Sequence, residues 1–357
     1  MNFFIFRLQT NMFRIVQIGV LGCCALLAAL NDETADAPPE LVEDTLAENL
    51  IADQPPTGFS VLPNHPDDNP VSPQKVALGR KLFFEPRLSK DATVACASCH
   101  RPDHGFANGD DVARGILGRR GKRNVPTIFN RGFGDSFSWD GKAKSLEEQV
   151  LTPIVNENEL GNTVEAVIKT LIADEEYVRL FRTVFGSADT EVANIVTPEN
   201  LGKAIAAFER TLVYGETRVD RFRAAEYTAL SREARQGMWI FESRGGCWKC
   251  HNGENFADED FHNTGVGFGL DGRDAGRFEI TELEEDRFKF KTPTLRGVEL
   301  TPPYMHDGSV GTLKEVVEFY NRGGAPDDPN LDADMEPLHL TDEEVGFLVE
   351  FLKALSK

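Results

Sequence analysis

One pentapeptide occurs twice in the sequence: a cysteine, two variable residues, a second cysteine and a histidine. It reads CASCH from Cys96 to His100 and CWKCH from Cys247 to His251. This spacing is the attachment signature of c-type haem, because two thiols add across the haem vinyl groups and the adjacent histidine ligates the iron. The repeated motif predicts two covalently bound c-type haems.

The use of the cysteines supports this prediction. Of the six cysteines, Cys23 and Cys24 lie in an N-terminal hydrophobic run and the other four belong to the two motifs. A Cys₄ zinc site is the serious alternative, since paired C-x-x-C motifs also build such sites. The histidine directly after each pair, and the export signal described next, favour haem. We therefore assign haem attachment and proximal iron ligation to Cys96, Cys99, His100, Cys247, Cys250 and His251.

The N-terminus has the features of an export signal. Two arginines precede a hydrophobic run, and a small-residue cleavage site ends at Ala37, which is typical of a signal peptide over residues 1–37. We expect a periplasmic protein with no membrane span in the mature chain. Lipid anchoring through Cys23 and a retained membrane anchor are the alternatives. Residues 38–56 are acidic and contain prolines, which predicts a disordered tether.

The chain is acidic, with a formal net charge of −20 at pH 7. Nucleic acid and anionic membrane surfaces select basic faces, so the charge argues against both as partners. A neutral or basic protein partner fits the charge better. Its 357 residues are enough for two domains of ordinary size.

Apolar residues recur at helical spacing, whereas alternating strand-like runs are scarce. The pattern predicts an all-α chain of two cytochrome c-like haem domains with little regular sheet, over residues 57–212 and 213–357. We expect the last helix to begin after Thr341, an N-cap residue followed by acidic residues. Clear helical patterns cover residues 145–154, 163–172, 198–212, 231–243 and 341–355.

Ordered blocks of the sequence resemble the bacterial dihaem cytochrome c peroxidase and MauG family. Between residues 72 and 356 they include LGRKLFFEPRLS, CASCH, GKRNVPTIFN, FSWDG, CWKCH and FKTPTLRGVELTPPYMHDGS. The resemblance implies an oxidoreductase that reacts with hydrogen peroxide. It implies that the N-terminal haem is the peroxide site and that the C-terminal haem transfers electrons.

The resemblance also implies three catalytic residues. Glu159 matches the acid-base catalyst, Gln149 a hydrogen-bonding group of the pocket, and Trp139 an indole between the haems that relays oxidising equivalents. Breaking the O–O bond of peroxide requires a group that moves a proton between its oxygens. Taken singly, Glu159 would more often be a solvated carboxylate and Trp139 a core residue.

A calcium ion between the haems is a further implication. Asn124, Thr301 and Pro303 occupy the matching positions, the last two with their backbone carbonyls. Calcium requires oxygen ligands of this kind. Asn and Thr in turns also commonly serve only to cap backbone groups.

Two positions distinguish the branches of the family. Peroxidases that require reductive activation have an iron-binding histidine in the loop before the R-N-x-P-T block, where this chain has Ile116. We expect His104 to be structural. Peroxidases have a methionine in the helix after H-D-G, whereas MauG-like members have a tyrosine, here Tyr320. The resemblance implies that Tyr320 is an axial ligand of the second haem, with Met305 or a core tyrosine as alternatives.

We therefore expect a MauG-like enzyme that uses peroxide to oxidise a protein substrate or a small redox protein such as a cytochrome or copper protein. The alternatives are a peroxide-detoxifying cytochrome c peroxidase and a non-enzymatic dihaem electron carrier. Assembly as a homodimer is an alternative to a monomer. Trp248, inside the second motif, and Trp239 could provide exit routes for oxidising equivalents, although we expect Trp239 to be buried.

Overall fold

Helices dominate the computed structural model, which describes residues 52–357. The predicted signal peptide, Cys23, Cys24 and most of the predicted tether lie outside the described residues. Regular sheet in residues 52–357 is limited to one antiparallel pair of strands, β1 (Phe261–His262) and β2 (Phe290–Lys291). No helix in this part of the chain is long and apolar enough to cross a membrane. The prediction of an all-α fold with little sheet is confirmed.

The first group of helices surrounds a hydrophobic core that includes Leu82, Phe83, Tyr177 and Phe181. Side chains of Ser, Thr or Asp cap the N-termini of its longer helices and satisfy backbone N–H groups there. The group contains α2 (Pro73–Phe83), α3 (Cys96–Cys99), α4 (Leu146–Val155), α5 (Val164–Ile172), α6 (Glu175–Phe185), α7 (Val192–Ile195) and α8 (Pro198–Glu209).

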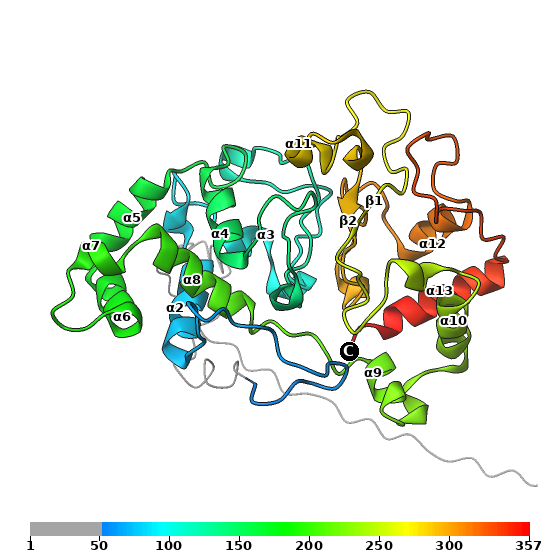
Figure 1. The fold of residues 1–357 in the computed structure, drawn as a ribbon, viewed down its shortest axis with the longest axis horizontal. Helices are drawn as coiled ribbons and strands as arrows, with labels where there is room; N and C mark the ends of the chain where they lie inside the picture. The colour runs from blue at the N-terminus through cyan, green and yellow to red at the C-terminus, as the bar shows by residue number, and fades with distance from the viewer. Residues whose placement is uncertain (1–51) are drawn as a thin grey trace, which may run out of the picture. The chain divides into compact units, whose positions relative to one another are not determined.

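The second group surrounds a separate core that includes Phe241, Phe256, Leu348 and Phe351. Thr341 caps the last helix by accepting a hydrogen bond from the N–H of Glu344, as predicted. The domain boundary at residue 213 remains a prediction. The group contains α9 (Arg218–Arg223), α10 (Arg232–Glu242), α11 (Phe278–Thr281), α12 (Leu313–Asn321) and α13 (Asp342–Ala354) (Figure 1).

Short 3₁₀ turns and irregular segments connect the helices. They also form much of the structure around the two haem motifs. The second motif itself lies in one such turn. The turns are Pro86–Leu88, Pro102–His104, Ile116–Gly118, Arg131–Phe133, Tyr227–Ala229, Cys247–Lys249, Glu284–Asp286 and Val298–Leu300.

The same close helix crossing occurs in both groups. Gly79 of α2 lies against the carbonyl oxygen of Ala204 in α8, and Gly237 of α10 lies against that of Phe347 in α13. A methyl group at either glycine would overlap the carbonyl oxygen. Glycine therefore allows these backbones to approach closely. Helices α2 and α10 are the helices that precede the two motifs, so each motif follows one of these crossings.

We predict that Gly79→Ala and Gly237→Ala each lower the free energy of unfolding by about 1–3 kcal/mol, because the added methyl groups overpack the crossings. Gly346→Ala is the matched control, since a Cβ at this exposed position in α13 meets no atom within 4 Å. The control should be neutral or slightly stabilising. Urea unfolding of the haem-loaded variants measures the difference, and equal effects at all three glycines would contradict the prediction.

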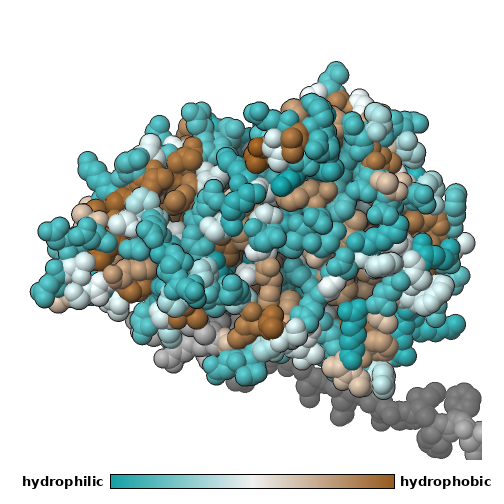
Figure 2. All heavy atoms as spheres, in the orientation of Figure 1, coloured by the Kyte–Doolittle hydropathy of each residue, from teal (hydrophilic) through white to brown (hydrophobic). Residues whose placement is uncertain are grey.

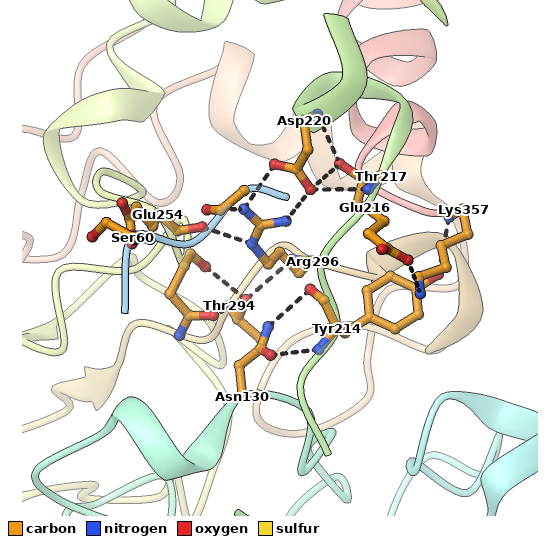
Figure 3. Close-up of polar contacts among 12 residues, drawn as sticks. Ser60, Asn130, Tyr214, Glu216, Thr217, Asp220, Glu254, Thr294, Arg296 and Lys357 are labelled. Atoms are coloured by element: carbon orange, nitrogen blue, oxygen red, sulfur yellow. Dashed lines mark hydrogen bonds and ion pairs between the residues drawn. The ribbon is translucent and has the colours of Figure 1, made fainter. Parts of the chain in front are cut away.

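A buried ion pair connects distant parts of the chain. Arg296 is 1% exposed, and its guanidinium donates to both carboxylate oxygens of Asp220 at 2.6 and 2.9 Å. It also donates to the backbone carbonyls of Glu254 at 2.6 Å and Gly58 at 3.1 Å. Figure 3 shows Arg296 between Asp220 and Glu254. One guanidinium thereby fixes α9, the loop after the second motif and a segment near the start of the described chain.

The face shown in Figure 2 is mostly hydrophilic, with hydrophobic side chains in small separate patches. The exposed large hydrophobic side chains include Trp239, at 58%, and Trp248, at 49%. The prediction that Trp239 is buried is therefore wrong. The buried stripe of α10 includes Gly237, Ile240 and Phe241. Trp239 lies outside this stripe, on the exposed side of the amphipathic helix.

Candidate active site

The first motif presents its histidine to a cavity. Helix α3 forms one turn in which His100 N–H donates to the carbonyl of Cys96 at 2.9 Å. His100 Nδ1 lies 3.0 Å from the carbonyl oxygen of Phe106. Because a carbonyl can only accept, Nδ1 carries the proton and Nε2 keeps the lone pair that can bind a metal. Burial lowers the pKa of His100, which also favours the neutral imidazole.

The second motif repeats this arrangement. His251 N–H donates to the carbonyl of Cys247 at 2.9 Å, and Nδ1 lies 3.0 Å from the carbonyl oxygen of Phe256. Burial lowers the pKa of His251 as well. Both motifs therefore hold a neutral imidazole in the tautomer that leaves Nε2 available to iron.

The donor set fits two haems better than one zinc ion. Cys96 packs against the first hydrophobic core and Cys247 against the second, so the two pairs of thiols do not share one buried environment. None of the four motif cysteines forms a disulfide. The cavity beside His100 has a volume of about 430 Å³, within the usual range of cofactor and ligand pockets.

A cluster that sequence reasoning missed adjoins the second motif. Cys250, Asp258 and His262 place possible ligand atoms within 4.8 Å of one another. However, His262 Nε2 lies 3.0 Å from Asp258 and Nδ1 lies 2.6 Å from Asp332. Contact with Cys250 and with both carboxylates raises the pKa of His262 to about 10. A protonated imidazole cannot ligate a metal, so these residues form an ion-pair network beside the haem motif.

The three predicted catalytic residues line the cavity that contains His100. Trp139 precedes α4, Gln149 lies on α4 and Glu159 follows it. Glu159 Oε1 accepts a hydrogen bond of 2.6 Å from Asn156 Nδ2. Burial raises the pKa of Glu159, so its carboxyl stays protonated to a higher pH than an exposed glutamate. Such a group can give a proton to a bound substrate and take it back.

The loop that contains Ile116 lies against Glu159. Ile116 is 4% exposed, and its N–H donates to the carbonyl of Glu159 at 2.8 Å. The side chain of His104 lies 3.2 Å from Asp103. Among the described residues that line the cavity, His100 is the only histidine, and neither methionine nor tyrosine occurs. The lining therefore offers no second histidine, methionine or tyrosine ligand for an iron bound by His100.

A second carboxyl in this cavity was also missed. Glu209 ends α8, is 8% exposed and contributes to the cavity lining. Burial raises its pKa to about 8. The available signal was its place directly after the apolar residues Ala206, Ala207 and Phe208, where a glutamate continues a buried run of the helix.

Trp139 contacts residues from both halves of the chain. Its Nε1 donates to the carbonyl of Asn124 at 2.9 Å, and its own carbonyl accepts from the N–H of Lys291 at 2.8 Å. The edge of the indole faces His306, with ring centroids 6.5 Å apart. These contacts fix the orientation of the indole at the cavity wall.

The predicted calcium ligands lie on neighbouring segments. Asn124 N–H donates to the carbonyl of His306 at 2.7 Å, which brings Asn124 beside the segment that carries Thr301 and Pro303. The side-chain nitrogen of Asn124 donates to two backbone carbonyls at 3.1 and 3.2 Å. This orientation leaves the side-chain oxygen as the atom available to a cation. Calcium binding by the three residues remains a prediction.

Tyr320 lies near the second motif. Burial first, and then the proximity of Cys250 and Cys247, raise the pKa of its phenol, whereas a hydrogen bond with Thr264 lowers it. The phenol of Tyr320 therefore interacts electrostatically with both attachment cysteines. Met305, the alternative ligand, lies in a tight turn closed by a 3.2 Å hydrogen bond from the N–H of Gly308.

Known proteins are similar to this chain in sequence and in fold. The family model of di-haem cytochrome c peroxidase matches residues 73–228. The chain is 39% identical to the methylamine utilization protein MauG of Methylorubrum extorquens, over 82% of this chain and 80% of that protein. It is 35% identical to the cytochrome c551 peroxidase of Pseudomonas aeruginosa, over 78% of this chain and 83% of that protein.

The solved structure of a MauG-like protein associated with microbial copper homeostasis has a TM-score of 0.76 to this chain at 30% identity. The match covers 84% of this chain and 94% of that one. The predicted family is confirmed. The chain belongs to the di-haem cytochrome c peroxidase family, a family of two-haem oxidoreductases, and to its MauG-like branch.

Proposed function

We propose that the chain is a periplasmic dihaem enzyme that uses hydrogen peroxide at the haem of Cys96 and Cys99 and oxidises a donor through the haem of Cys247 and Cys250. The observation that carries this proposal is the cavity beside His100. Among its described lining residues it has Glu159 and no second histidine, methionine or tyrosine. Peroxide can therefore enter without displacing such a side chain. When bound, the haems supply the redox chemistry, and the protein supplies position and protons.

Within this cavity, Glu159 moves the proton between the two peroxide oxygens. Its burial favours the protonated carboxyl, and the hydrogen bond from Asn156 fixes the position of Oε1. Gln149 provides an amide that can orient peroxide from the same cavity wall. Trp139 relays oxidising equivalents toward the second haem, and its contacts with Asn124 and His306 hold it for this role.

At the second motif, Tyr320 and His251 would both hold the iron of the second haem. The electrostatic interaction of the Tyr320 phenol with both motif cysteines supports this role. An anionic oxygen ligand stabilises oxidised iron more than a neutral thioether does. The second haem would then store an oxidising equivalent and not act as a high-potential electron reservoir.

The donor is a neutral or basic protein, as the net charge of −20 favours. Trp248, exposed inside the second motif, offers an exit toward a protein at the surface, and so does the exposed Trp239. Detoxification of peroxide, with a small cytochrome or copper protein as reductant, is the second candidate function, because the relatives include a cytochrome c551 peroxidase. Membership of this enzyme family argues against a non-enzymatic electron carrier.

We predict that Glu159→Gln retains both haems but slows the reaction with peroxide by roughly a hundred- to ten-thousandfold, the usual contribution of an acid-base group. Stopped-flow mixing with peroxide measures the rate. Glu157→Gln is the matched control, since it makes the same change at an exposed neighbour. A Glu159→Gln rate equal to that of the control would remove Glu159 from the mechanism.

We also predict that Tyr320→Met raises the reduction potential of the second haem, because thioether ligation favours ferrous iron. Spectroelectrochemical titration resolves the potentials of the two haems. Tyr227→Met serves as control, since Tyr227 is one of the exposed hydrophobic residues. If the potential and the ferric spectrum of the second haem stay unchanged in Tyr320→Met, Tyr320 is a core residue and the proposed ligation is wrong.

A further inference from the structure

Glu209 places a carboxyl at the first cavity that the proposed mechanism does not use. The residue is 8% exposed, and it borders the same cavity as His100 and Glu159. No hydrogen bond from any other residue in the range 52–357 ends on its side-chain oxygens. These oxygens are not among the fully enclosed polar atoms of residues 52–357, so they open onto the cavity, where a bound group can reach them.

The nearest cations are engaged elsewhere. Arg210 donates to both oxygens of Glu147 at 2.6 and 3.0 Å, and Arg131 donates to both oxygens of Glu259 at 3.0 Å each. The charges that face Glu209 are thus Arg210 and Arg131, each already paired, and the carboxylate of Glu147. Burial outweighs them and raises the pKa of Glu209 to about 8. Burial therefore favours the neutral carboxylic acid, which has one O–H donor.

The cavity occupant must then offer an acceptor. The vinyl groups of a c-type haem are consumed by the cysteines and the rest of its rim is hydrocarbon, so its two propionate carboxylates are the strong acceptors. Glu209 also acts electrostatically on Cys96, because burial first and then this glutamate raise the pKa of the Cys96 thiol to about 12. Around the macrocycle, each vinyl-bearing pyrrole adjoins a propionate-bearing one. The pyrrole attached to Cys96 is therefore a neighbour of a propionate-bearing pyrrole.

We propose that Glu209 is a protonated acid that donates its hydroxyl to a propionate of the first haem and so links the potential of that haem to pH. The inference rests on the proposed attachment of this haem at Cys96 and Cys99. Reduction lowers the charge on the iron and therefore favours retention of the proton on the acid. The potential should consequently fall as pH rises through the titration of Glu209.

The test compares Glu209→Gln, which keeps an N–H donor but cannot titrate, with Glu209→Leu, which has neither property. Glu199→Gln, at an exposed position of the same helix, is the control. Two readouts are recorded on the full-length, haem-loaded proteins. One is the potential of the first haem against pH, and the other is the propionate bending band in the resonance Raman spectrum.

We expect the reduction potential of the first haem to fall as pH rises in the wild type and in the control. In both Glu209 variants this pH dependence should be lost. The propionate band should persist in Glu209→Gln and shift in Glu209→Leu. An unchanged slope in Glu209→Gln overturns the proposal, even if Glu209→Leu fails to fold. An unchanged band in a folded Glu209→Leu also overturns it. Haem content by pyridine haemochrome separates these outcomes from failure of the proposed function, which would appear as fewer than two haems in the wild type.

Discussion

The buried contact between Arg296 and Asp220 supports the geometry of the second haem site. The same guanidinium holds the carbonyl of Glu254 at 2.6 Å, two residues before Phe256, whose carbonyl orients His251 at 3.0 Å. An arginine that is buried this deeply requires its partner, because loss of one member of a buried pair typically costs about 3–5 kcal/mol. The loop whose carbonyl contacts the proximal histidine is thus held by an ion pair distant from it in sequence.

The two haem motifs share their local geometry and differ in what faces them. In each motif a backbone carbonyl five or six residues after the histidine accepts a hydrogen bond from Nδ1–H, which leaves Nε2 available to iron. The first histidine then faces a cavity lined by two carboxyls, the half-buried Glu159 and the buried Glu209. The second motif has Tyr320 near its cysteines and the protonated His262 beside Cys250. The proposed difference in chemistry therefore comes from the surrounding side chains and not from the motifs themselves.

Local signals allowed part of this structure to be predicted from the sequence. The haem motifs, the helical patterns and the cap at Thr341 each depend on residues within a few positions of one another. Glu159 was identified through resemblance, and its burial could not be derived from its polar neighbours. The environments of Glu209 and His262 escaped prediction, because Asp332, for example, is 70 residues from its partner His262. Trp239 is exposed because it lies outside the buried stripe of its amphipathic helix, which includes Gly237, Ile240 and Phe241.

We propose that His100 alone would ligate the first iron, whereas His251 and Tyr320 would both ligate the second. The burial of Ile116 against the carbonyl of Glu159 supports the open position at the first iron. Electron paramagnetic resonance of the resting, fully ferric enzyme tests this claim most directly. The account predicts one high-spin and one low-spin ferric signal. Two low-spin signals would contradict it, because a side chain would then close the site that peroxide must enter.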